Sequence, residues 1–294
     1  MFAFCFSINI RFHKKETGVV NGVNNDTYTY NGNRYRKRSE MDARTGFVLA
    51  SAASGIIMSV LPSFSNPFLK QMKKEHSNNH LYKDAFFKSL ELSGLEDKGL
   101  RLIDTRFKNS AEERMFNLGE KVVDGEIKAG LNACYIPDLK VIKLNADKAT
   151  ISGFHELGHA MNNLKGKFGR FLQKCRVPGY SVAGLMGTVA LFSRHKPKEA
   201  ERNLDDVIMD NCGVIAFAGM LPTVAEEALA SHKGIKIAKQ AGLAEPLVKN
   251  LKKFYGKALM SYVGYAVLTG LSVFAASKIT EVFTKPEKIE RYGR

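Results

Sequence analysis

Four long stretches without a charged side chain restrict the possible folds of this chain more than any other feature. They cover residues 45–69, 177–193, 211–225 and 258–277. A helix that crosses a bilayer core needs about 20 predominantly apolar residues, with a range of roughly 17 to 25. Residues 258–277 fit best, because no face of a helix formed by them is polar enough to be exposed to water. Their small residues also allow a neighbouring helix to pack closely. We therefore expect a multi-pass integral membrane protein.

The shorter stretches leave an alternative open. Residues 177–193 and 211–225 are also short enough to be buried helices of a soluble, α-rich core. In a membrane they would form either two spans or a re-entrant or tilted hairpin. Residues 46–61 are apolar enough for a helix that Pro62 and Pro67 would end. The sequence thus predicts three to four membrane-associated helices.

The second informative feature is the motif His155-Glu156-Leu157-Gly158-His159, which lies in a helical pattern. Residues four apart lie one above the other on an α-helix, so His155 and His159 direct two imidazoles to one point. Zn²⁺ binds neutral imidazole nitrogens, and a catalytic zinc site keeps one position open for water. Beside such a metal, Glu156 can take a proton from water and pass it to a leaving amine. Apolar residues around these side chains favour a metal site over a solvated helix face, and Gly158 indicates a close approach by another element.

A third protein ligand has to come from elsewhere in the chain. The candidates are Asp205, Asp206, Asp210, Glu226, Glu227, His195 and His232. Glu226 and Glu227 fit best, because they directly follow an apolar stretch, where a carboxylate is costly unless a cation pairs with it. Pro222 indicates that a helix opens just before them. The alternative is that both are first-turn glutamates stabilised by the helix dipole.

The region between the first two apolar stretches is charged and mostly helical in pattern. Residues 81–92 and 111–131 have the periodicity of amphipathic helices, and residues 133–137 and 140–144 that of a small strand pair. We expect the side chain of Asn145, Asp147 or Thr150 to cap the helix that carries His155.

The predicted fold is mainly α with a small β element (α+β), in seven successive regions. These are a polar N-terminal tail (1–44), a first transmembrane segment (45–69), a soluble region with helices, edge strands and the His155 helix (70–176), an apolar helical hairpin (177–225), a helix with the third ligand (226–257), a last transmembrane segment (258–277) and a basic C-terminal tail (278–294).

Charge and cysteines narrow the function. The net charge is +15, but the basic residues are spread along the chain and no nucleic-acid recognition motif is present. We therefore expect no nucleic-acid partner, whereas basic residues beside apolar segments fit an anionic membrane surface. The 4 cysteines include no Cys-x-x-Cys pair and are expected to be reduced thiols.

Residues 132–231 resemble the integral-membrane zinc metallopeptidases of the HtpX and CAAX prenyl protease type, which are gluzincins. Asn132-Ala133-Cys134-Tyr135-Ile136-Pro137 stands where the family has Asn-Ala-x-x-x-Pro, ahead of the His-Glu-x-x-His helix. Glu227-Ala228-Leu229-Ala230-Ser231 stands where the family has Glu-x-x-Ala-Asp. The resemblance implies a zincin-like core with Glu227 as third ligand. It also places Ser231 where the family has an Asp that orients a metal-binding histidine, and it leaves His232 as a candidate for the transition-state donor.

We therefore predict a membrane-embedded, zinc-dependent metalloendopeptidase with one Zn²⁺ per chain. His155, His159 and Glu227 would bind the metal, and Glu156 would be the catalytic base. The edge strand near residues 135–144 would hold an extended peptide or membrane-protein substrate. The alternative, motivated by Ser231, is a non-catalytic membrane adaptor or scaffold with a structural or relic zinc site. The sequence does not determine on which side of the membrane the site lies.

Overall fold

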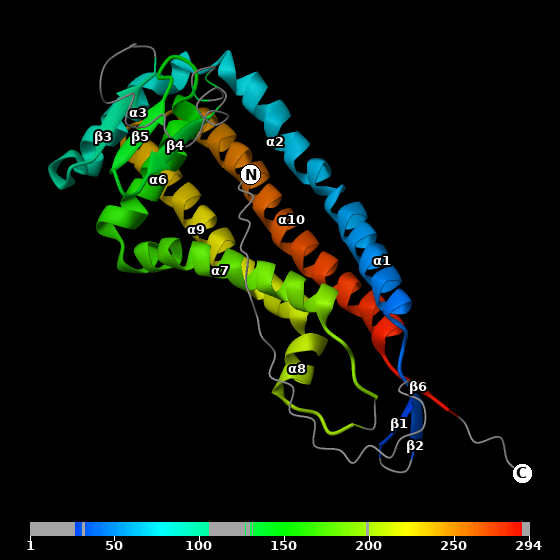
Figure 1. Cartoon of the computed structure of the whole chain (residues 1–294). Helices are drawn as coiled ribbons and strands as arrows, with labels where there is room; N and C mark the ends of the chain where they lie inside the picture. Colours follow the sequence, from blue (N-terminus) through cyan, green and yellow to red (C-terminus); the bar gives the residue numbers. More distant parts are fainter. Residues whose placement is uncertain are drawn as a thin grey trace, which may run out of the picture.

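The computed structural model describes residues 27–30, 33–105, 127, 130, 132–197 and 200–289. These residues form a mostly helical fold with two small sheets, which confirms the mainly α prediction (Figure 1). The helices are α1 (Glu40–Met58), α2 (Leu61–His76), α3 (His80–Ser93), the 3₁₀ turn η1 (Glu96–Lys98), α6 (Thr150–Lys165), α7 (Lys167–Phe192), α8 (Leu204–Asp210), α9 (Cys212–Gln240) and α10 (Glu245–Thr284). The strands are β1 (Thr27–Tyr30), β2 (Asn33–Arg36), β3 (Arg101–Asp104), β4 (Ala133–Ile136), β5 (Val141–Leu144) and β6 (Glu287–Lys288).

One end of the molecule is a head built from α3, β3, β4, β5 and α6 against the ends of α9 and α10 (Figure 1). Its sheet has the order β3-β5-β4, with β3 parallel and β4 antiparallel to β5. The predicted helix at 81–92 is α3 and the predicted strand pair is β4 and β5, so both predictions are confirmed. Most of the predicted helix at 111–131 lies outside the described residues. The head core includes Tyr82, Phe86, Leu144, Phe154, Leu157 and Leu251.

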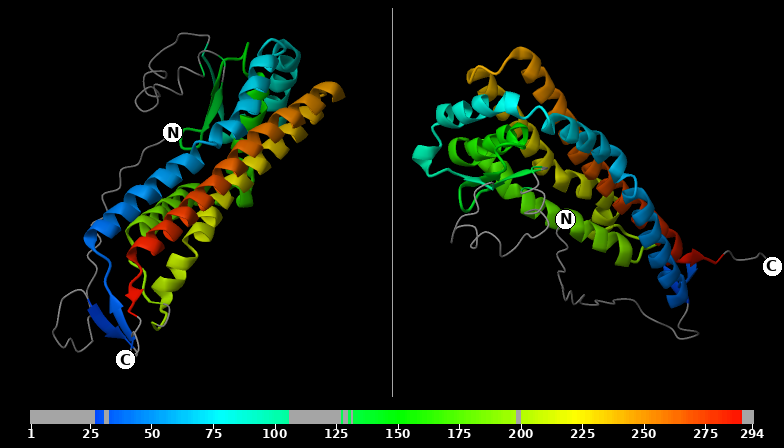
Figure 2. Two further views of the ribbon diagram at one scale, coloured as in Figure 1. Left: turned by 90° about the vertical axis from the view of Figure 1, so that its right-hand side faces the viewer. Right: turned by 90° about the horizontal axis from the view of Figure 1, so that it is seen from above.

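The rest of the molecule is a stem of long helices that lie side by side (Figure 2). α10 runs along its whole length, with α2 and α1 on one side and α9 on another (Figures 1 and 2). The stem core includes Ala50, Ala183, Met186, Ala216, Met220, Ala266 and Val273. The alanines among them let the helices approach closely, as in helix packing within a bilayer.

Three helical segments among the described residues are long and apolar enough to cross a membrane. They are Glu40–Glu75, which comprises α1 and most of α2, Cys212–Gln240 and Glu245–Thr284. The apolar stretch at 177–193 forms the second half of α7 and packs against α9, but α7 does not meet the same criterion. Many apolar side chains of α1 and α10 face outward, including Val48, Ile56, Leu271 and Phe274.

The prolines act differently from the prediction in the first apolar stretch. α1 begins early, at Glu40, because Ser39 and Asp42 form a reciprocal capping box. It ends at Met58, ahead of Pro62, which lies in the first turn of α2. Pro62 is tolerated there, because a residue in the first turn has no backbone N–H hydrogen bond within the helix to lose. Pro67 lies inside α2, contrary to the prediction that it ends a helix.

Pro222 does not open a helix, so that prediction is wrong. It lies inside α9, which runs without a break from the stem into the head. Proline there removes the hydrogen bond to the carbonyl of Ala218, and the packing of α6, α7 and α10 around α9 maintains the helix. Glu226 and Glu227 are therefore in the middle of a helix, which removes the first-turn dipole as their source of stability.

The start of α6 is stabilised from a distant part of the chain. None of Asn145, Asp147 and Thr150 caps it by a side-chain hydrogen bond, so that prediction is wrong. Instead, Oδ1 of the buried Asn79 accepts hydrogen bonds from the Thr150 N–H and the Thr150 hydroxyl, both at 2.7 Å. Asn79 Nδ2 donates to the carbonyl of Ala146 at 3.2 Å. An asparagine from the start of α3 thus satisfies backbone groups that the local sequence leaves open.

Gly158 allows α6 and α9 to cross at close range. A Cβ at this position would collide with the backbone of Ala230 on α9. At the other end of the same crossing, a Cβ at Gly234 would collide with the backbone of Phe154. The close approach expected from Gly158 is therefore that of α9, and it brings Glu227 to the His155 helix.

Substituting Gly158 tests this crossing. We expect Gly158→Ala to lower the free energy of unfolding by about 1–3 kcal/mol, because the methyl group has to push two backbones apart. Gly184→Ala is the control, since a Cβ there meets nothing within 4 Å. Thermal unfolding of both variants in detergent measures the difference, and a Gly158→Ala protein as stable as the control would contradict the crossing.

Candidate metal centre

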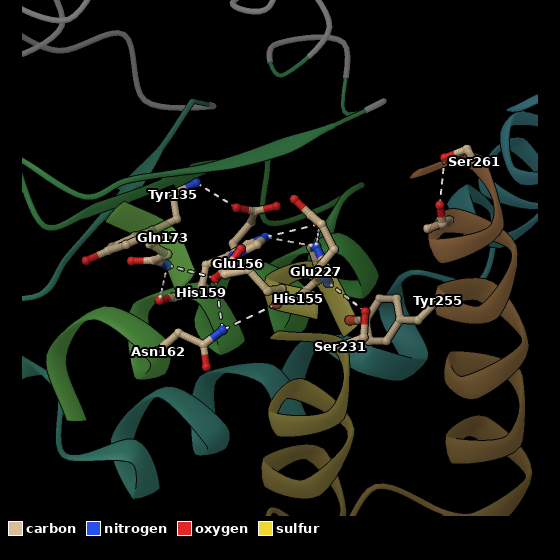
Figure 3. Close-up of polar contacts among 12 residues, drawn as sticks. Tyr135, His155, Glu156, His159, Asn162, Gln173, Glu227, Ser231, Tyr255 and Ser261 are labelled. Carbon is tan, nitrogen blue, oxygen red and sulfur yellow. Dashed lines mark hydrogen bonds and ion pairs between the residues drawn. The ribbon is translucent and has the colours of Figure 1, made fainter. Parts of the chain in front are cut away.

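α6 brings His155 and His159 together, as the spacing of the motif predicts. Their Nε2 atoms lie 3.0 Å apart, and the rings are nearly perpendicular with centroids 4.5 Å apart (Figure 3). His159 is buried, and the side chain of His155 is 14% exposed. The ring of His155 also packs against Tyr255 of α10, whose hydroxyl donates to the carbonyl of Ile151 at 2.6 Å.

Glu227 of α9 completes a triangle of donor atoms. Its Oε2 lies 3.0 Å from His155 Nε2 and 3.5 Å from His159 Nε2 (Figure 3). Ligands of tetrahedral Zn²⁺ at about 2.0–2.1 Å lie roughly 3.3 Å from one another. Two imidazole nitrogens and one carboxylate oxygen at these separations therefore fit a zinc ion. Two overlapping groups of described residues have ligand atoms close enough for one ion: His155, Glu156 and His159, and His159, Glu226 and Glu227.

Glu226, the other candidate for third ligand, has a different place. Its Oε1 lies 2.8 Å from His159 Nδ1, on the side of the ring away from Glu227. The same oxygen accepts hydrogen bonds from Asn162 and Gln173, each at 2.9 Å. A carboxylate on the far nitrogen fixes the tautomer and orientation of a metal-binding histidine. The geometry therefore favours Glu227 over Glu226 as ligand.

Ser231 holds the other histidine. Its hydroxyl oxygen lies 3.1 Å from His155 Nδ1, and the side chain is buried (Figure 3). This is the position at which the resemblance implies a histidine-orienting Asp. Both Nδ1 atoms thus have a partner, which leaves both Nε2 atoms directed toward Glu227.

Arg176 of α7 joins the centre, which the sequence reasoning missed. Its guanidinium contacts Glu226 Oε2 at 3.2 Å and Glu227 Oε1 at 3.1 Å. The side chains of the two glutamates are 0% and 2% exposed, so both carboxylates are deeply buried. Arg176 lies directly before the uncharged stretch at 177–193, and this position is a sequence signal that could have identified it. Two buried carboxylates thus contact one guanidinium, and the carboxylate of Glu156 lies beside the histidines. A divalent cation would offset the remaining negative charge.

Glu156 lies beside the histidines and contacts the edge of the sheet. Its Oε2 accepts a hydrogen bond from the backbone N–H of Tyr135 at 2.7 Å (Figure 3). Burial raises the pKa of Glu156, although the neighbouring His159 and His155 act in the opposite direction. Burial alone would lower the pKa of His159, but Glu227 and Glu226 raise it well above its usual value.

The remaining candidates for third ligand belong to no group of ligand atoms among the described residues. Asp206 completes the capping box of α8 with Asn203 and pairs with Lys196 at 3.0 Å, and Asp210 pairs with Arg202. The His195 ring lies near the hydroxyl of Thr284, and both Asp205 and His232 are exposed. Cys175 and Cys212 are free thiols, as expected from the absence of a Cys-x-x-Cys pair.

No protein-family model matches this sequence, and searches of curated proteins and of solved structures found no match either. The chemistry of the centre therefore has to follow from its geometry.

Replacing Arg176 tests the charge balance of the centre. In the presence of a chelator we expect Arg176→Gln to lower the free energy of unfolding by about 3 kcal/mol, because it leaves two buried carboxylates without their cation. A divalent metal ion should restore part of this loss by supplying the missing positive charge. Lys174→Gln, an exposed position on the same helix, is the control.

Thermal unfolding in detergent, with chelator and with zinc, measures both effects. An Arg176→Gln protein that unfolds at the wild-type temperature in chelator would show that the guanidinium does not hold the carboxylates in place.

Proposed function

We propose that this chain is a membrane-embedded, zinc-dependent metalloendopeptidase with a zincin-like core. The observation that carries the proposal is the triangle of His155 Nε2, His159 Nε2 and Glu227 Oε2, with mutual distances of 3.0–3.5 Å. Three protein donors with their own hydrogen-bonded partners are typical of catalytic zinc sites, which keep a fourth position for water or substrate. The resemblance of residues 132–231 to the HtpX and CAAX prenyl protease type supports the same ligand set.

Glu156 is the general base in this proposal. Zinc supplies Lewis-acid activation of water and of the scissile carbonyl. Glu156 takes the proton of the attacking water and delivers it to the leaving amine. Its carboxylate is positioned for this, because it lies next to both histidines and its Oε2 is held by the Tyr135 N–H at 2.7 Å.

β4 supplies the surface for the substrate backbone. Among the described residues β4 pairs with β5 alone, and in this proposal an extended peptide adds to the opposite edge of β4. The backbone N–H of Tyr135, which donates a hydrogen bond to Glu156, lies on this edge. A peptide added as a further strand would therefore pass beside Glu156 and the two histidines.

The membrane setting indicates where the substrate comes from. Glu226 and Glu227 follow directly on the apolar part of α9, within a helix long and apolar enough to cross a bilayer. Tyr255, which packs on His155, lies three residues before the apolar stretch of α10. The site thus lies near the end of the apolar segments, within reach of a peptide or a membrane protein.

Zinc content tests the ligand set. We expect about one zinc per chain in detergent-purified wild type, and almost none in His155→Ala and Glu227→Gln, because each removes one of three donors. Glu226→Gln is the matched control, because it keeps all three metal donors and alters a carboxylate that contacts the far nitrogen of His159. It should weaken zinc affinity by roughly 10–100-fold, and its site should still be occupied in excess zinc. Metal analysis of the four proteins gives the answer. Equal zinc in wild type and Glu227→Gln would remove Glu227 from the ligand set.

Peptide cleavage tests the base. Glu156→Gln should retain zinc but lower the cleavage rate of an unstructured fluorogenic peptide by about 100-fold or more, because the amide cannot take the proton. Wild type and variant are purified in parallel, so that a contaminating protease would appear in both. Cleavage by the variant at the wild-type rate would end this mechanism.

A non-catalytic membrane adaptor with a structural zinc site is the second candidate. The burial of Glu227 and the contact of its Oε1 with Arg176 favour it, since both close the centre to solvent. A wild type that holds one zinc per chain and cleaves no peptide would support this candidate over the peptidase.

A further inference from the structure

A groove between α2 and α10 lies outside the metal centre. It has a volume of about 360 Å³ and is lined by Ser63, Phe64, Pro67, Lys253, Gly256, Lys257 and Met260. α2 and α10 lie side by side along this seam (Figures 1 and 2). Both helices belong to segments long and apolar enough to cross a membrane, so the groove would open toward lipid.

The two ends of the groove differ in chemistry. Phe64, Pro67 and Met260 make one end apolar, and Met260 begins the outward-facing apolar surface of α10. Lys253 and Lys257 make the other end basic, one helical turn apart on the same face of α10. Lys70, one turn beyond Pro67 on α2, is exposed and extends the positive charge.

Buried polar residues hold one of these ammonium groups in place. Lys257 Nζ donates to Gln71 Oε1 at 2.9 Å, and Gln71 Nε2 donates to Glu75 Oε1 at 2.8 Å. Glu75 is buried and also accepts a hydrogen bond from the hydroxyl of Tyr82 at 3.3 Å. An ammonium has three donors, so Lys257 keeps two for a ligand in the groove.

We propose that this groove binds an anionic phospholipid of the surrounding bilayer, with its phosphate at Lys253 and Lys257 and the start of one acyl chain against Phe64 and Met260. Basic pockets between transmembrane helices suit anionic headgroups, and the apolar end matches the acyl chain. The volume is at the small end for a ligand pocket, so the groove holds the headgroup region while the rest of the lipid stays in the bilayer. The proposal depends on the membrane placement and is independent of the metal chemistry.

Gly256 gives a direct way to fill the groove. A Cβ at Gly256 meets nothing within 4 Å, so Gly256→Leu adds a side chain to the groove without a backbone clash. Gly55→Leu is the matched control, because Gly55 lies in α1 with equally open space around it. For the charges, Lys253→Gln with Lys257→Gln is compared with Lys236→Gln and Lys252→Gln, which are exposed and do not line the groove.

The experiment is native mass spectrometry of the full chain in detergent, titrated with phosphatidylglycerol and with phosphatidylcholine of the same acyl chains. We expect wild type to prefer phosphatidylglycerol on the order of tenfold. The Lys253 and Lys257 double variant should lose this preference, Gly256→Leu should lose binding of the first lipid, and both controls should behave as wild type. Unfolding temperatures of all variants show that they are folded.

Three results would overturn the proposal. They are equal binding of the two lipids by wild type, an undiminished preference in the Lys253 and Lys257 double variant, and displacement of the lipid by millimolar inorganic phosphate. The last would assign the basic end to a free anion rather than to a lipid headgroup.

Discussion

Glu226 and Glu227 are buried next to each other in the middle of α9, and a buried carboxylate is stable only with a counter-charge or hydrogen-bond donors around it. Two of the helices that pack against α9 supply such partners. α6 contributes two imidazoles and the amide of Asn162, and α7 contributes Arg176 and Gln173. One buried polar cluster thus joins α6 and α7 to α9 and helps to fix their mutual positions.

Adjacent positions on α9 give these two carboxylates different roles. Consecutive residues on a helix point about 100° apart, so the two side chains cannot face the same atoms. Glu227 faces both Nε2 atoms, whereas Glu226 reaches the far side of the His159 ring. The continuity of α9 through Pro222 matters here, because a helix that began at Pro222 would leave the angle between the stem and these side chains undefined.

Local sequence patterns predict part of this structure, whereas the rest depends on contacts between residues far apart in the chain. The helix with His155 and His159, the helix at 81–92 and the strand pair before the motif depend on periodicity within a few turns, and all of them form. The cap of α6 comes from Asn79, about seventy residues earlier, which no local propensity indicates. The roles of Arg176 and Glu226 also depend on distant contacts, because they arise only when α6, α7 and α9 pack together.

α10 contributes residues both to the groove and to the surroundings of the candidate metal centre. Tyr255 packs its ring against His155, and Lys253 and Lys257, two residues to either side, point into the groove on another face of the helix. Gly256 lies between these faces and keeps the groove open without weakening the contact of Tyr255. A lipid in the groove would therefore contact one face of α10, while His155 of the candidate metal centre contacts Tyr255 on another face. The same short segment, just before the apolar stretch of α10, thus contributes both to the groove proposed for a lipid and to the packing behind the candidate metal centre.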